Sequence, residues 1–156
     1  MIEWVSKSRL LGMTADEKLT WARHMLQLKK LFAKKLGLLK KSRFLPRNVH
    51  QDLYFKVILP SVTYGLILWG SCCNSDLFQS LERLNRRAAR FIFHLPKDMA
   101  SADVLQRAQR PTLFIYYKLA IFICLHKAFH GRLPVILIDL ISKKRATNYS
   151  TRTCAF

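Results

Sequence analysis

The sequence predicts a mostly α-helical, bundle-like single domain, and three observations support that prediction. Its 156 residues suit one domain, and a chain of that length buries about two thirds of its unfolded surface. In residues 18–41 and 77–95, apolar side chains recur every three or four positions, which is the spacing of one helix face. Residues 57–70 form a charge-free, mostly apolar run. We expect this run at the centre of the core, because exposed apolar surface costs about 25 cal/mol per Å².

The start of the chain leaves open a short β-strand pair. Residues 3–12 alternate only loosely between apolar and polar types, so the strand signal is weak. Thr14 or Asp16 is expected to cap the next helix. Asp16 and Glu17 would then lie at the positive end of the helix dipole, which favours acidic side chains.

The later elements follow from the same periodicity and from the residues that interrupt it. The helix over residues 18–41 is expected to bury one apolar stripe, which consists of Trp21, Met25, Leu28, Phe32, Leu36 and Leu39. Pro96 and Gly131 are expected to end two of the later helices. Asn74 or Ser75 is the expected N-cap of another. Helices are expected over residues 49–59, 60–69, 76–95, 100–109, 112–130 and 134–141.

A membrane span is the competing interpretation of the run at residues 57–70. A span needs about 20 apolar residues, whereas this run is shorter and is interrupted by Pro60 and Gly65. No transmembrane segment is therefore expected. The four cysteines include no C-x-x-C pair and are expected as reduced thiols, and the N-terminus lacks the pattern of a signal peptide. Both features predict an intracellular location, in the cytoplasm or the nucleus.

The charge balance is the strongest functional signal. The chain has 27 Lys and Arg but 9 Asp and Glu, a net charge of +18, which a nucleic acid would neutralise; an anionic membrane surface is the alternative. Solvated helix faces usually mix both signs, because opposite charges four residues apart attract. Two predicted helices instead have one-signed faces, and we expect the first face to contribute more. The candidate nucleic-acid-binding residues are Arg23, Lys30, Lys34, Lys41, Arg83, Arg87 and Arg90.

Catalytic and metal-binding patterns are weak by comparison. His126 and His130 would share one helix face, but Lys127 stands where a zinc protease has its glutamate. The acids are scattered apart from Asp16 and Glu17, whereas a two-metal site needs clustered carboxylates. The sequence contains no P-loop and no nucleophile elbow. We therefore expect no catalytic residue, no metal and no cofactor.

An ordered set of motifs gives the chain a family resemblance. The blocks are L-G at residues 11–12 with D-x-x-L-T-W-x-x-H at 16–24, I-L-P-S-V-T-Y-G at 58–65 with W-G at 69–70, L-N-R-R-A-A-R-F-I at 84–92, L-P at 133–134, and N-Y-S-T-R at 148–152. Together they resemble the C-terminal, post-palm part of the reverse transcriptase of a non-LTR retrotransposon, of the LINE type and similar to the jockey and CR1 elements. The likeness covers nearly the whole chain.

The resemblance implies a truncated, thumb-like fragment. Residues 1–13 would end a palm-like strand or hairpin, residues 14–141 would form the helical thumb and post-thumb region, and residues 142–156 would be a basic flexible tail. In this family the catalytic aspartates belong to palm motifs upstream of the matched region, and this chain has no Asp-Asp pair, so it is not expected to be an enzyme. The expected function is non-catalytic gripping of template and primer, whether RNA, an RNA–DNA hybrid or DNA. The alternatives are a helical module that docks on the missing palm and fingers, and a protein that binds anionic membranes.

Overall fold

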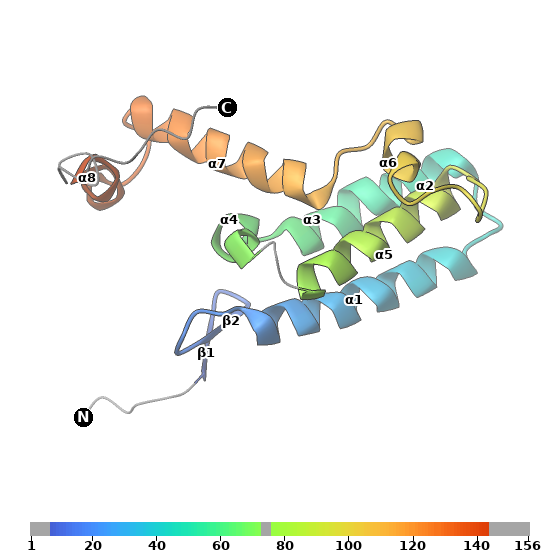
Figure 1. Ribbon diagram of the computed structural model, residues 1–156, viewed down its shortest axis with the longest axis horizontal. Helices are drawn as coiled ribbons and strands as arrows, with labels where there is room; N and C mark the ends of the chain where they lie inside the picture. Colours follow the sequence, from blue (N-terminus) through green and yellow to red (C-terminus); the bar gives the residue numbers. More distant parts are fainter. Residues whose placement is uncertain (1–6, 73–75, 144–156) are drawn as a thin grey trace. The chain divides into compact units, whose positions relative to one another are not determined.

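The computed structural model describes residues 7–72 and 76–143, and it confirms a mostly helical fold with one short strand pair (Figure 1). The chain divides into two compact units, residues 1–120 and residues 121–156. The strands are β1 (Lys7–Leu10) and β2 (Met13–Asp16). The helical elements are α1 (Ala22–Lys41), α2 (Arg47–Leu53), the π-helical turn η1 (Tyr54–Ile58), α3 (Leu59–Thr63), α4 (Leu66–Trp69), the 3₁₀ turn η2 (Gly70–Cys72), α5 (Asp76–Ile92), α6 (Asp103–Arg107), α7 (Leu113–Phe129) and α8 (Val135–Lys143).

The strand pair is a tight antiparallel hairpin in which Leu10 pairs with Met13. Leu11 and Gly12 both have positive φ, as a two-residue hairpin turn requires. The expectation that a helix starts at Thr14 or Asp16 is therefore wrong, because both residues lie on β2.

Asp16 nevertheless stabilises the turn that leads into α1. Its carboxylate accepts hydrogen bonds from the backbone N–H of Thr20 at 3.0 Å, the hydroxyl of Thr20 at 2.6 Å and the backbone N–H of Trp21 at 2.9 Å. These bonds lower the pKa of Asp16, the Thr20 hydroxyl contributing most. Leu19 and Trp21 have positive φ, so the chain bends sharply here before it enters α1 at Ala22.

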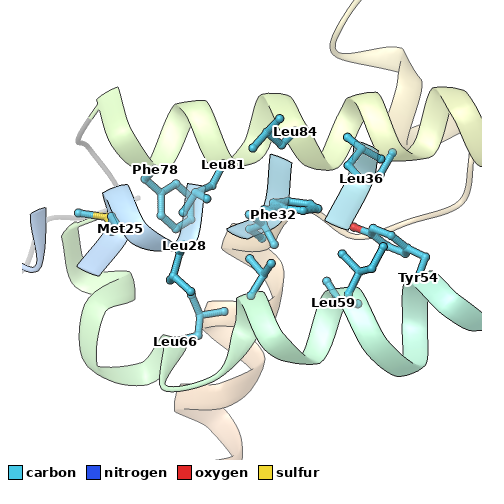
Figure 2. Packing of buried hydrophobic residues seen from close by; sticks show 14 of the residues in the cluster. Met25, Leu28, Phe32, Leu36, Tyr54, Leu59, Leu66, Phe78, Leu81 and Leu84 are labelled. Atoms are coloured by element: carbon cyan, nitrogen blue, oxygen red, sulfur yellow. The ribbon is translucent and has the colours of Figure 1, made fainter. Parts of the chain in front are cut away.

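The core of the first unit is a helical bundle in which α1, α5 and the segment from α2 to α3 surround one apolar cluster. Helices α1 and α5 run in the same direction (Figure 1). The chain connects them through the continuous segment α2, η1 and α3, which runs in the opposite direction. Figure 2 shows apolar side chains from these elements pointing toward one another, among them Phe32, Leu59 and Leu81. The predicted stripe on the first helix is confirmed. Five of its six residues are buried, and Trp21 is half-buried at the edge of the core.

The apolar run breaks where a continuous helix was expected. Helix α3 ends at Thr63, and Gly65 has φ +64°, so the predicted helix from residue 60 to residue 69 is wrong. A Cβ atom at residue 65 would overlap the sulfur of Met13, so the hairpin packs directly against this bend. The short α4 then places Trp69 in the core, where its indole N–H donates to the carbonyl of Tyr64 at 3.0 Å. The expected N-cap at Asn74 or Ser75 lies outside the described residues.

Helix α5 ends at Ile92, earlier than the predicted residue 95. His94 has φ +51°, and the N–H of Leu95 reaches back to the carbonyl of Arg90 at 3.0 Å. This left-handed residue and backward bond are a common way to terminate a helix. The predicted helix over residues 100–109 is shorter in the structure, and α6 packs on Ala89 in a small second apolar cluster.

The described part of the second unit consists of the end of α7 and α8. Gly131 has φ +63°, which confirms it as the residue that closes α7, and the N–H of Arg132 bonds to the carbonyl of Lys127 at 2.8 Å. None of the described helices is long and apolar enough to cross a membrane. Helix α8 ends at Lys143, so it includes the first two residues of the predicted flexible tail; the rest of that tail, residues 144–156, lies outside the described residues.

Candidate nucleic-acid interface

The predicted basic line on α1 lies along the outer face of that helix. Arg23, Lys30, Lys34 and Lys41 are all exposed and lie opposite the buried stripe. From the first to the last of them the helix rises about 27 Å, at about 1.5 Å per residue. The line is therefore accessible to a long anion, and none of its four residues lines the two cavities described below.

The predicted basic residues of α5 divide into two environments. Arg83 and Arg87 are exposed, whereas Arg90 is half-buried. The Nη2 atom of Arg90 donates to the backbone carbonyl of Met99 at 2.9 Å, so the loop after α5 holds this guanidinium in place. The Nε atom of Arg90 is buried and has no hydrogen-bond partner. Arg90 is thus a positioned cation, and Arg83 and Arg87 are solvated ones.

Two neighbouring open cavities lie at the end of the bundle where α1 and α5 both finish. We call them together the end cavity. The first, which we call the cationic lobe, has a volume of about 530 Å³ and is lined by Lys40, Arg87 and Lys97. The second, which we call the aromatic lobe, has a volume of about 490 Å³ and is lined by Leu45, His50 and His94. Four residues line both lobes: Arg43, Arg90, Phe91 and Leu95.

The end cavity has a one-signed charge. Five of its residues are Lys or Arg, and no acid lines either lobe. Cations at helix C-termini are often present only to compensate the negative end of the helix dipole, which amounts to about half a charge per helix. Two helices end here, so dipole compensation accounts for about one positive charge of the five. In the described part of the chain, none of the five makes an ion pair. The cavity therefore contains more positive charge than the helix dipoles and ion pairs around it neutralise.

A buried histidine holds the wall of the aromatic lobe in place. The Nε2–H of His50 donates to the carbonyl of Ser42 at 2.8 Å, which ties the start of α2 to the end of α1. Its ring meets the ring of Phe91 edge to face, with centroids 5.2 Å apart. This contact joins α2 to α5, so the loop that contains Arg43 is held beside the last turn of α5.

The structure brings together only part of the predicted site. Arg87 and Arg90 line the end cavity, whereas Arg23, Lys30, Lys34 and Lys41 lie along α1 and Arg83 lies outside the lining. Sequence reasoning did not name the other lining residues as binding candidates, among them Lys40, Arg43, Phe91, His94 and Lys97. A usable signal existed, because both predicted helices end in basic residues and a return segment between them would place those ends together.

His126, on α7, and His130, just after the end of that helix, do lie beside each other, with ring centroids 4.3 Å apart. Among the described residues there is no group of three or more side chains that could hold a metal ion. No protein family, no curated protein and no solved structure matches the chain. Any assignment of function therefore depends on the geometry and charge of the molecule itself.

Proposed function

We propose that this protein is a non-catalytic nucleic-acid-binding fragment that grips RNA, an RNA–DNA hybrid or DNA through the phosphate backbone, as the thumb-like region of a LINE-type reverse transcriptase would. The end cavity is the observation that supports this proposal. It combines five cations with no acid and with volumes of about 490 and 530 Å³. Arg and Lys side chains of this kind are the groups that bind phosphates in most nucleic-acid complexes.

The cavity changes the order of importance that the sequence suggested. Cations that converge on one concave site act on the same phosphates, whereas those on the outer face of α1 act one at a time. We therefore expect Lys40 and Arg87 to contribute more than Lys34 and Arg83. The exposed basic residues along α1 would add further phosphate contacts along the nucleic-acid strand.

The test is a comparison of two matched double variants. Lys40→Gln plus Arg87→Gln removes one Lys of α1 and one Arg of α5 from the cavity lining. Lys34→Gln plus Arg83→Gln removes the same residue types and the same net charge from exposed positions outside it. Binding of a labelled RNA strand is measured by fluorescence anisotropy at several salt concentrations, on variants whose folding has been checked by circular dichroism.

The salt dependence reports how many phosphate contacts are lost. Contacts by three to five cations give the wild-type protein a slope of log affinity against log salt of about −2 to −4.5. The cavity variant should flatten this slope by about 1.4–1.8, because each lost contact removes about 0.7–0.9. The outer variant should flatten it by less than half as much. Equal effects of the two variants would show that only the net charge matters, and wild-type binding without any salt dependence would exclude the proposal.

A second candidate function is a helical module that docks on a missing polymerase core. Apolar exposure on α7 favours it: only Leu113 of this helix is buried. In the first unit α7 exposes Phe114, Ile115 and Leu119, and in the second unit it exposes Phe122, Ile123, Leu125 and Phe129. Exposed apolar side chains on one helix often mark an interaction site. Apolar docking persists at high salt, whereas phosphate binding weakens steeply, so the same titration separates the two candidates.

A further inference from the structure

The two lobes of the end cavity differ in chemistry. Beyond the shared lining, the cationic lobe adds three cations, whereas the aromatic lobe adds two imidazole rings and an aliphatic side chain. The shared residues Arg43 and Arg90 lie between a surface suited to anions and a surface suited to a flat ring. Phosphate and base are the two halves of a nucleotide that need these two surfaces.

We propose that the end cavity takes a single unpaired nucleotide, with its phosphate in the cationic lobe and its base in the aromatic lobe beside Phe91 and His94. This inference rests on the proposed function and adds a preference for single strands over duplex. The nucleotide can be free or part of a strand, since the chemistry that the cavity recognises is the same.

The volume of the cavity supports one nucleotide rather than a duplex. Lobes of about 490 and 530 Å³ lie in the range of about 300–1,000 Å³ that is typical of sites for small ligands. The base of a duplex is stacked and paired, and taking it out of the helix costs a few kcal/mol. A base in a single strand is already available to the aromatic lobe.

The positioned guanidinium of Arg90 supports the orientation of the nucleotide. Arg90 is fixed through the carbonyl of Met99, so little side-chain entropy remains to be lost when it meets a phosphate. A guanidinium also donates in a planar fork that matches phosphate oxygens. Because Arg90 and Arg43 line both lobes, a phosphate beside them would leave the attached base at the entrance of the aromatic lobe.

The experiment compares ligands that have or lack the base. Adenosine 5′-monophosphate, ribose 5-phosphate and inorganic phosphate compete against a labelled single-stranded RNA on the full chain. Stacking of one base corresponds to about fivefold in affinity or more, so adenosine 5′-monophosphate should compete at a concentration at least about fivefold lower than ribose 5-phosphate. In a direct titration, the single strand should bind more tightly than a duplex of the same sequence and length.

Two variants separate the lobes. His94→Asn removes the imidazole, and asparagine tolerates the left-handed backbone that residue 94 adopts. Phe91→Leu keeps an apolar side chain at a half-buried position. Each should reduce the advantage of adenosine 5′-monophosphate over ribose 5-phosphate and leave ribose 5-phosphate unchanged. Lys40→Gln plus Arg87→Gln should weaken all three competitors together.

The outcomes distinguish this inference from the proposed function. Equal competition by adenosine 5′-monophosphate and ribose 5-phosphate, or duplex binding as tight as single-strand binding, overturns the nucleotide site and leaves phosphate-backbone binding in place. Binding of adenosine 5′-monophosphate by a chain that binds no strand supports the nucleotide site and overturns the proposed function. If the variants perturb folding, nuclear magnetic resonance shifts of the wild-type protein decide the matter. Resonances of Phe91 and His94 must move with adenosine 5′-monophosphate and stay in place with ribose 5-phosphate.

Discussion

The Oε2 atom of Glu82 on α5 accepts a hydrogen bond from the backbone N–H of Leu113, the first residue of α7, at 2.9 Å. Both residues are buried. The other carboxylate oxygen of Glu82 accepts from the side-chain amide of Asn85 at 3.4 Å, and the hydroxyl of Tyr54 donates to the carbonyl oxygen of Asn85 at 2.5 Å. A connected polar network inside the bundle therefore joins η1, α5 and the beginning of α7.

Removal of the Glu82 carboxylate should destabilise the bundle. In Glu82→Ala the N–H of Leu113 and the amide of Asn85 lose their acceptor while they remain buried, and we expect a loss of about 2 kcal/mol in the free energy of unfolding. Glu82→Gln keeps an acceptor for Leu113 and should stay within about 1 kcal/mol of wild type. Urea unfolding followed by tryptophan fluorescence measures both. Arg83→Ala, at an exposed neighbouring position, is the control, and a similar loss in that variant would contradict the role of the network.

The same carboxylate should make stability depend on pH. Burial raises the pKa of Glu82 above its ordinary value of 4.5, and this outweighs the opposing effects of Leu113, Asn85 and Arg86. A raised pKa means that the folded state holds the proton more tightly than the unfolded state. Its stabilising contribution is fully present below pH 4.5 and is lost as the pH rises through the folded-state pKa.

The measurement is the difference in unfolding free energy between wild type and Glu82→Gln at pH 4 and at pH 7. Other titrating groups are common to both proteins and largely cancel. We expect wild type to lose stability relative to the variant as the pH rises. A difference that stays constant, or that shifts in favour of wild type, would show that the pKa of Glu82 is not raised.

Two glycines should respond to alanine in opposite directions. Gly37 lies within α1 with nothing near its missing Cβ, so Gly37→Ala should stabilise the protein by about 0.5–1 kcal/mol. Gly65 has positive φ and packs against Met13, so Gly65→Ala should destabilise it by at least about 1–2 kcal/mol. Thermal unfolding measures both shifts. Adding Met13→Ala to Gly65→Ala removes the overlap but leaves the backbone strain, so a loss should persist in the double variant.

The exposed apolar side chains of α7 should cause self-association at low micromolar concentration. Screening by salt should strengthen the association, because it reduces the repulsion between chains of charge +18. Phe122→Gln plus Ile123→Gln, at two exposed positions of α7, should weaken it, while Lys127→Gln on the same helix should not. Sedimentation velocity checks all three proteins. A wild-type monomer at every concentration and salt level would contradict this expectation.

The sequence predicted the helical elements better than it predicted the residues at which they begin, end or bend. The sequence predicted that Thr14 or Asp16 would cap a helix, but α1 begins at Ala22 and the Asp16 carboxylate acts from the end of a strand. The run at residues 57–70 was expected wholly in the core, but the structure buries only one side of it: Ile58, Leu59, Val62, Leu66 and Trp69 are buried, whereas Val57, Tyr64, Ile67 and Leu68 are exposed. The bend at Gly65 packs against the hairpin through Met13. Met13 and Gly65 are far apart in the chain, whereas periodicity describes only neighbours a few positions apart.

The sequence by itself determined the helical class, the buried faces of α1 and α5 and the excess of positive charge, because each follows from local spacing or from composition. Only the tertiary structure decided which cations act together. The return of the chain through α2, η1 and α3 makes α1 and α5 parallel, so Lys40 and Arg43 meet Arg87, Arg90 and Lys97 at one end of the bundle. A helix face can be read from a periodicity of 3.6 residues, but the direction in which two helices pack depends on the whole path between them.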